Sequence, residues 1–265
     1  MHYVRRGKRG ALRSVICAIS NWKPGSEPDY LTQLTAGARE RARERGYLFS
    51  PETIAAGVVA NPEALRRKLR SRGVQGVLFL PMSPPVDLAG LLDWSDLSVV
   101  AASLSVLGPE MNRVAPNHFA NTLRLFREMA ARGYRRIGLV VDVEQDRRTN
   151  RGFSAAALSF GWHEAEERVV PLVWKGDLVA AIRPWFRKEK PDLVVTTSEH
   201  LVRACAAALG VPVNGAVGFA STNVRPGPGG RNPIAGIDEM PREIGASAVD
   251  LLASLIERRA RGLPK

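Results

Sequence analysis

Polar side chains that could hold a small ligand follow the apolar runs that the sequence predicts as strands. Asparagine, serine and arginine offer hydrogen-bond donors and acceptors, and tryptophan offers a flat apolar face. Open parallel sheets bind ligands outside the carboxyl ends of their strands, so the residues just after each run are the candidates. The candidates are Asn21 and Trp22, Met82 and Ser83, Asn117, Arg147 and Arg148, Ser198 and Glu199, and Ser221 and Asn223.

The sequence patterns that would indicate catalysis or metal binding are weaker than those that indicate a ligand site. Glu199 and His200 could form an acid–base pair, but Ser198 followed by Glu199 also fits a helix cap with an acid in the first turn. The four histidines and two cysteines lack metal-ligand spacing. The loop after the first apolar run has neither a dinucleotide fingerprint nor a phosphate cradle, and the sequence has no hydrolase elbow. We therefore expect no enzymatic activity, no metal and no cofactor.

Two groups of candidates also have a purely structural explanation. Arg147 and Arg148 could equally cap the next helix or face water. The tryptophans in strand-end loops could stack on a ligand ring, although buried packing is the more frequent use of this side chain. For both groups, the sequence does not decide between ligand binding and the structural explanation.

A repeated phrase organises the elements that would position these side chains. A basic residue, a glycine and an apolar run follow one another at 132–141, and also at 45–49, 72–80 and, more weakly, 209–211. The phrase predicts a helix that ends on a left-handed glycine and is followed at once by a buried strand. Strands and helices that alternate so regularly predict an α/β fold of two doubly wound, mostly parallel sheets. The two series of elements meet near Asn117.

Two segments of the second series are predicted less directly. Residues 142–150 are rich in charged side chains and are predicted to form a loop after the strand at 137–141. A strand is predicted near 169–173, where valines and a leucine follow one another.

Composition and charge narrow the class of protein. The 265 residues are 45% hydrophobic and 24% charged, which is ordinary for a soluble globular protein. Cys17 and Cys205 are too few for a disulfide framework and fit a reducing compartment. No apolar run approaches the ~18 residues that span a bilayer, and no signal segment opens the sequence, so we expect no membrane contact and a cytoplasmic location.

The net charge of +12 permits an acidic partner such as nucleic acid, but it does not define a site. Many of the arginines fall on predicted helices, where a solvated outer face explains them. Residues 1–13 carry five basic side chains among glycines, with little to pack, and are predicted to form a flexible basic linker.

Three passages together resemble the effector-binding part of the LacI/GalR (lactose-repressor) family of bacterial transcription regulators. Residues 133–139 (GYRRIGL) resemble the phrase that opens the family's second lobe. Residues 191–199, with 210–212 and 217–219, resemble its later strand, helix and strand. Residues 237–252 resemble its closing strand and helix. The likeness extends over nearly all of the chain from Ser14 to Lys265.

The resemblance implies a periplasmic-binding-protein-like type I fold of two lobes joined by crossing strands. It places the N-terminal lobe at 14–117, completed by 237–265, and the C-terminal lobe at 118–236. It also implies a small effector in the interlobe cleft, a homodimer, and control of operator DNA through the angle between the lobes. A solute-binding protein of a transport system with the same fold is the alternative, which the missing signal segment disfavours.

Departures from the family pattern limit what the resemblance implies. Members carry an N-terminal helix-turn-helix, whereas residues 1–13 resemble only the linker that follows it. The isolated chain is therefore expected to bind DNA only in a salt-sensitive, sequence-independent way. Sugar-binding members usually have Asn-Asp where this chain has Ser198 and Glu199, and an acid where it has Ala220-Ser221. The missing groups hold sugar hydroxyls, so an ordinary monosaccharide is in doubt.

Overall fold

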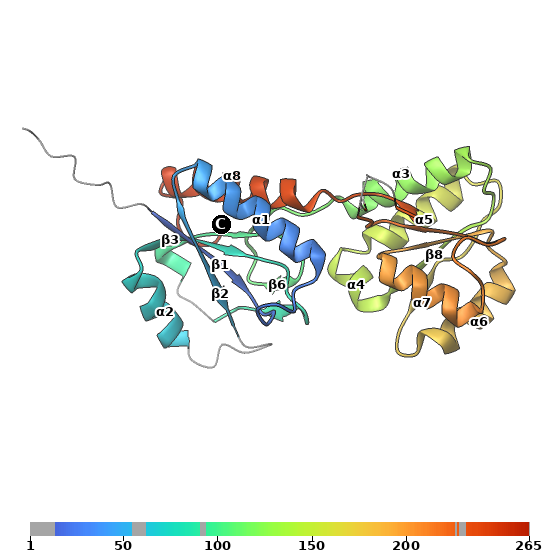
Figure 1. Cartoon of the computed structure of the whole chain (residues 1–265), viewed down its shortest axis with the longest axis horizontal. Helices are drawn as coiled ribbons and strands as arrows, with labels where there is room; N and C mark the ends of the chain where they lie inside the picture. The colour runs from blue at the N-terminus through green and yellow to red at the C-terminus, as the bar shows by residue number, and fades with distance from the viewer. Residues whose placement is uncertain (1–13, 55–61, 91–93, 226, 228–231, 265) are drawn as a thin grey trace, which may run out of the picture. The chain divides into compact units, whose positions relative to one another are not determined.

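The computed structural model describes residues 14–54, 62–90, 94–225, 227 and 232–264, so the predicted basic linker at 1–13 lies outside the described residues. The chain forms two compact units (Figure 1). The first unit contains the residues up to Ala115 and those from Met240 onward, and the second contains Pro116–Glu239. Each unit is a parallel sheet with helices on both faces, which confirms the predicted α/β fold of two doubly wound, mostly parallel sheets.

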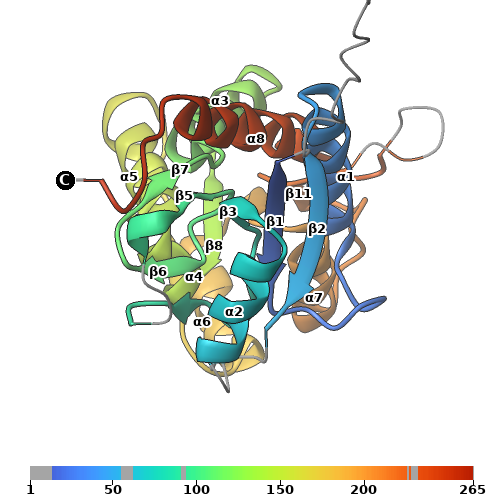
Figure 2. The ribbon, with the colours of Figure 1, turned by 90° about the vertical axis from the view of Figure 1, so that its left-hand side faces the viewer.

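The first unit is built on a five-stranded parallel sheet in the order β2-β1-β3-β5-β7. Its strands are β1 (Val15–Ser20), β2 (Leu48–Thr53), β3 (Val74–Phe79), β5 (Ser98–Ala101) and β7 (Asn112–Arg113). One face is covered by α1 (Asp29–Glu44) and α8 (Pro241–Glu257), which lie side by side in Figure 2. The other face packs against α2 (Pro62–Ser71) and a short 3-10 helix, η1 (Trp94–Asp96). A separate pair of short parallel strands, β4 (Val86–Asp87) and β6 (Val106–Gly108), comes from the segments between β3 and β5 and between β5 and β7.

Two glycines allow α1 and α8 to pack with their backbones in contact. A Cβ atom built on Gly245 of α8 would lie 2.1 Å from the carbonyl oxygen of Leu34, and one built on Gly37 of α1 would lie 2.1 Å from the carbonyl oxygen of Arg242. The carboxylate of Asp250 in α8 also accepts hydrogen bonds from Arg41 of α1 at 2.8 to 3.0 Å. The last helix of the chain therefore completes the core that the first strands and α1 begin.

The second unit repeats the architecture with the strand order β12-β11-β10-β8-β9. Its strands are β8 (Ile137–Asp142), β9 (Leu172–Trp174), β10 (Leu193–Thr196), β11 (Gly218–Ser221) and β12 (Ala235–Gly236). One face packs against α3 (His118–Ala131) and α5 (Gly152–His163), and the other against α6 (Leu178–Glu189) and α7 (Glu199–Leu209). A six-residue helix, α4 (Val143–Arg148), follows β8 directly.

The predicted helix end on a glycine is confirmed at all four places, and a strand follows closely after Gly46, Gly73 and Gly133, whereas after Gly210 the next strand begins only at Gly218. Each glycine of the phrase has a left-handed backbone, which only glycine adopts without strain. The φ angles are +80° at Gly46, +64° at Gly73, +96° at Gly133 and +71° at Gly210. After Gly133, the backbone N–H groups of Arg135 and Arg136 donate to the carboxylate of Asp192 at 2.9 and 3.1 Å. The phrase at 132–141 thus also ties the start of β8 to the start of β10.

Two predictions of local structure were wrong. The charged segment at 142–150 is largely helical, because Asp142 caps α4 by accepting the backbone N–H groups of Glu144 and Gln145 at 2.9 and 3.1 Å. The strand predicted near 169–173 begins only at Leu172. The N–H of Val170 donates to the carboxylate of Glu189 at 3.0 Å and its carbonyl accepts the indole N–H of Trp185 at 2.7 Å, so side chains satisfy this backbone instead of a neighbouring strand.

Candidate functional site

In the first unit, the predicted ligand residues after β1 and β3 lie together. The amide of Asn21 donates to the carbonyl oxygen of Pro84 at 3.1 Å, and its oxygen accepts the backbone N–H of Ser83 at 2.9 Å. The N–H of Met82 donates to the hydroxyl of Ser105 at 2.8 Å. Asn21 and Met82 are both buried. These contacts tie the residues after β1 to those after β3 at the carboxyl edge of the sheet, so both polar groups of the Asn21 side chain already bond the backbone of the chain itself.

Two other predicted ligand residues have structural contacts of a different kind. Trp22 is half-buried and packs against the core that α1 and α8 form with the sheet. The side chain of Asn117 caps α3 by accepting the backbone N–H of Ala120 at 3.0 Å. Their part in ligand binding stays a prediction.

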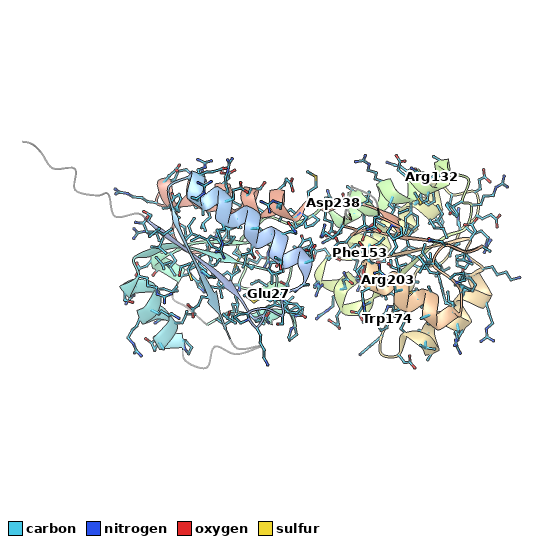
Figure 3. All side chains as sticks on the ribbon, viewed as in Figure 1. Glu27, Arg132, Phe153, Trp174, Arg203 and Asp238 are labelled. Carbon is cyan, nitrogen blue, oxygen red and sulfur yellow. The ribbon has the colours of Figure 1, made fainter. Side chains whose placement is uncertain are left out.

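In the second unit, Arg225 brings Glu199 and Asn223 together. Arg225 is not one of the ligand residues predicted from the sequence. Glu199 follows the α7 cap Ser198 and accepts the backbone N–H of Arg225 at 2.9 Å and the amide of Asn232 at 2.8 Å. The guanidinium of Arg225 donates to Asn223 and Asp238, each at 2.8 Å. The side chains of this unit, with Asp238 and Arg203 labelled, are drawn in Figure 3. The network ties Asn223, Arg225 and Asn232, which lie between β11 and β12 in the sequence, to the start of α7.

Ser221, the last residue of β11, belongs to the same loop. It is fully buried, its hydroxyl donates to the carbonyl oxygen of Asn223 at 3.0 Å, and it accepts the N–H of Asn223 at 3.1 Å. The structure therefore places Ser198, Glu199, Ser221 and Asn223 at one edge of one sheet. The only sequence signal for Arg225 was its position, two residues beyond Asn223 in a strand-end loop.

Glu199 should make the second unit sensitive to acid. Burial acts to raise the pKa of Glu199, but hydrogen bonds from Arg225 and Asn232 and the charge of Arg203 lower it on balance below its ordinary value of 4.5. A carboxyl whose pKa is lowered by folding stabilises the fold above its unfolded pKa, and this stabilisation is lost as the pH falls through the folded value.

We expect Glu199→Gln to lower the free energy of unfolding by about 1 to 2 kcal/mol at pH 7, because hydrogen bonds to a charged acceptor become neutral ones. The difference from the unchanged chain should shrink below about pH 4.5, as the glutamate itself becomes protonated. Urea denaturation of both proteins from pH 7 to pH 3 measures this. A difference that stays constant with pH would show that the charge of Glu199 is unimportant.

The two adjacent arginines at the end of α4 differ sharply in environment. Arg147 is exposed and donates to Glu144 on the same helix at 3.1 Å. Arg148 is only partly exposed and makes no hydrogen bond or ion pair with any residue that the structure describes. Burial lowers the pKa of Arg148, and the charge of Asp142 offsets this only in part. Both arginines are predicted as ligand residues from the sequence, whereas the structure places them in different environments.

A buried histidine and glutamate join the two ends of the second unit. Nδ1 of His118, the first residue of α3, lies 3.2 Å from the carboxylate of Glu239, and both side chains are largely buried. The imidazole also packs on Phe153 of α5, with ring centroids 4.7 Å apart. This pair is not predictable from the sequence, because the two residues are far apart along the chain and neither belongs to a motif.

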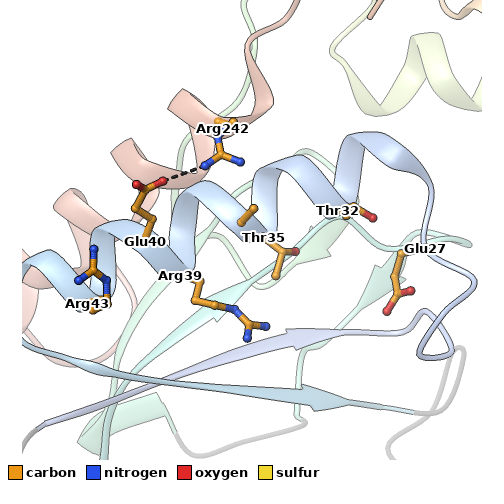
Figure 4. Close-up of a pocket in the computed structure, with 8 residues that line it drawn as sticks. Glu27, Thr32, Thr35, Arg39, Glu40, Arg43 and Arg242 are labelled. Atoms are coloured by element: carbon orange, nitrogen blue, oxygen red, sulfur yellow. Dashed lines mark hydrogen bonds and ion pairs between the residues drawn. The ribbon is translucent and has the colours of Figure 1, made fainter. Parts of the chain in front are cut away.

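A groove of about 640 Å³ runs along the outer face of α1 in the first unit (Figure 4). It combines charges of both signs with threonine hydroxyls, and an ion pair of 2.8 Å between Glu40 and Arg242 forms part of its wall. Its lining residues are Glu27, Thr32, Thr35, Ala36, Arg39, Glu40, Arg43 and Arg242. None of the ligand residues predicted from the sequence lines it.

Several other chemistries find no support in the part of the chain that the structure describes. It contains no cluster of three or more metal-ligating side chains. Cys17 and Cys205 are buried free thiols, and burial raises the pKa of each to about 12, which disfavours the reactive thiolate. No described helix has the length and apolar character needed to cross a membrane.

Two doubly wound parallel units define the class of the protein as a periplasmic-binding-protein-like fold of the kind found in LacI-family regulators. A candidate ribose operon repressor from Burkholderia thailandensis matches with a TM-score of 0.70 and 20% identity, over 94% of this chain and 95% of the other. The transcriptional regulator CelR in complex with cellobiose matches with a TM-score of 0.65 and 20% identity, over 95% and 81%.

The lac repressor dimer bound to operator and the anti-inducer ONPF is similar to this chain with a TM-score of 0.64 and 14% identity, over 94% of this chain and 90% of the repressor. No family model matches the sequence, and no curated protein matches it. The resemblance to the LacI/GalR effector-binding domain is confirmed at the level of the fold, and these structural relatives are transcription regulators.

Proposed function

We propose that this chain is the ligand-sensing and dimerisation domain of a LacI-type DNA-binding transcriptional regulator. Its effector would be a small sugar-like or other polar metabolite, bound by the residues at the carboxyl edges of the two sheets. The observation that carries the proposal is the match of the fold, over 94% of this chain, to a repressor dimer bound to operator and an anti-inducer. The polar groups gathered at the edges, Asn21 and Ser83 in the first unit and Glu199 and Asn223 in the second, support it.

Regulation would follow from a difference in affinity. An effector that binds one arrangement of the two units more tightly than another shifts the population toward that arrangement. The same difference in binding free energy then appears as a change in operator affinity, typically by ~5- to 150-fold. Operator binding itself would require a helix-turn-helix head.

Calorimetric titration of the chain with sugars, purines and nucleotides tests the sensing function. We expect at least one compound to bind without being chemically changed. Recovery of every bound compound intact, checked by mass spectrometry, separates a sensor from an enzyme. Turnover of any compound would contradict the proposal.

Dimerisation and DNA control need a separate experiment. Sedimentation should give twice the mass of one chain. A fusion carrying a helix-turn-helix head of known operator preference should bind that operator, and the effector found by calorimetry should change the affinity by ~5-fold or more. The chain without the head should bind DNA weakly and without sequence preference, and the binding should weaken as salt is raised. A chain that remains monomeric, or a fusion that ignores the effector, would reject the regulatory role.

A further inference from the structure

The side chain of Arg148 has unused hydrogen-bonding capacity at the carboxyl edge of the second sheet. Its guanidinium offers five N–H donors, yet it makes no hydrogen bond or ion pair with any described side chain or backbone group. Asp142 is the one residue whose charge acts appreciably on it. A partly buried cation without a hydrogen-bonded partner is costly, so an arginine in this state is suited to an anion supplied from outside.

The geometry of α4 directs Arg148 toward the strand ends. Residues three apart share a face of a helix, so Arg148 lies one turn beyond Gln145 on the same side. Gln145 accepts a hydrogen bond of 2.8 Å from the hydroxyl of Thr197, which directly follows β10. Arg147 lies off this face and pairs with Glu144 in solvent. Of the two arginines, only Arg148 shares the face of α4 that contacts the edge of the sheet.

Two further donors on the same edge lack an acceptor. The indole N–H of Trp174, in register with Asp142 on the neighbouring strand, is buried and has no hydrogen-bond partner. The hydroxyl of Thr222, which follows β11, is fully buried and also unpaired. Neighbouring strands are about 4.8 Å apart and these two groups lie on opposite sides of β8, so roughly 14 Å separates them and one anionic group cannot contact both.

The acidic groups of this edge, by contrast, already have donors. Asp142 accepts two N–H groups of α4, Asp146 accepts two hydrogen bonds from Ser154, and Glu199 accepts those of Arg225 and Asn232. A polyol needs free acceptors as well as donors, whereas a carboxylate or phosphate needs donors only. Of the unpaired groups named here, the guanidinium of Arg148 and the indole of Trp174 can only donate, whereas the hydroxyl of Thr222 can also accept.

We infer that the effector of this chain is anionic and that its carboxylate or phosphate group binds the guanidinium of Arg148. The inference rests on the proposed ligand-sensing function and names the chemical class of the effector. Neutral sugars should therefore bind much more weakly than their acidic counterparts.

Three matched sets of probes test this by calorimetry on the whole chain: glucose and ribose, then glucose 6-phosphate and ribose 5-phosphate, then glucuronate and gluconate. We expect a phosphate ester or a carboxylate to bind. Arg148→Gln should weaken that binding by ~10-fold or more, because charge-assisted hydrogen bonds are lost. Arg147→Gln is the matched control and should leave the affinity within about twofold, because its side chain lies in solvent.

Thermal unfolding shows whether Arg148→Gln is folded, and its melting temperature should not fall, since the guanidinium has no hydrogen bond to lose. If a neutral sugar binds and Arg148→Gln leaves its affinity unchanged, the anionic effector is rejected while the sensing function stands. If an acidic probe binds equally well to Arg148→Gln, the assignment of the residue is rejected. If no probe of any set binds at millimolar concentration, the inference is rejected, and the broader compound titration decides the sensing function separately.

Discussion

Replacing Gly245 by alanine is expected to destabilise the first unit by about 3 kcal/mol or more. A Cβ at this position would lie 2.1 Å from the carbonyl oxygen of Leu34 and 2.9 Å from the backbone nitrogen of Ala38. Both contacts are with the backbone of α1, so no side chain can rotate away, and the two helices must separate. Overpacking usually costs about 1 to 3 kcal/mol, and a clash with a rigid backbone belongs at or above the upper end.

The chain offers a matched control in Gly161 of α5. A Cβ there would meet no atom within 4 Å, so Gly161→Ala introduces no clash. Because alanine is the better helix former, this variant should be more stable by about 0.5 to 1 kcal/mol. Urea denaturation followed by circular dichroism measures both variants against the unchanged chain. Equal stability of Gly245→Ala and Gly161→Ala would show that α1 and α8 are not in the close contact described.

The consequence reaches beyond local packing, because α8 comes from the end of the chain. The apolar residues of α8, Ala248 and Leu252 among them, lie in the same buried cluster as Ile16 of β1 and Leu34 of α1. Separating α8 from α1 therefore exposes the core on which β1 rests, and Asn21 directly follows that strand. Gly245→Ala should weaken any ligand binding that depends on the first unit to the extent that this unit unfolds, because the apparent affinity falls with the folded fraction.

The parts of the fold that the sequence predicts well are those set by local physics. A glycine after a basic helix end needs only a left-handed φ, and the four copies of the phrase place four helix ends correctly. The strands at 137–141 and 193–196 are apolar on both sides, as strands buried in a parallel sheet must be. The failure near Val170 has the opposite cause, because distant side chains, Glu189 and Trp185, satisfy its backbone.

The candidate site is predictable only in part, because contacts between residues far apart in the sequence also shape it. Strand-end position is a local signal and selected Asn21, Ser83, Glu199 and Asn223. Whether such a side chain has free hydrogen-bonding groups depends on partners elsewhere in the chain. Asn21 is tied to a loop that begins some sixty residues later, and Arg225 is invisible as a partner of Glu199 until α7 is placed. The difference between Arg147 and Arg148 likewise appears only once 142–150 is known to be helical.

Replacing Asp146 by alanine is expected to destabilise the second unit by about 3 kcal/mol. Asp146 is buried in α4, and its carboxylate accepts the backbone N–H of Ser154 at 3.0 Å and the hydroxyl of Ser154 at 2.6 Å. The residue that precedes α5, Arg151, makes no side-chain capping bond, so Asp146 supplies the acceptor that the first turn of α5 needs. Alanine would leave the buried N–H of Ser154 unpaired and its hydroxyl with only the longer contact of 3.4 Å to the carbonyl oxygen of Arg151, and an unpaired buried donor costs about 1 to 3 kcal/mol.

Asp146→Asn keeps one acceptor oxygen in the same place and should recover about half of the loss or more, because the hydroxyl of Ser154 can instead accept from the new amide. Amide hydrogen exchange distinguishes this role from general destabilisation: protection should fall first at Ser154 and its neighbours in α5. Protection that falls evenly over both units would contradict it.

Asp146 lies two residues before Arg148 on the same short helix, so releasing α4 from α5 also frees Arg148 from the strand ends. An effector that depends on Arg148 should therefore bind more weakly to Asp146→Ala, even where the variant remains folded, and nearly normally to Asp146→Asn.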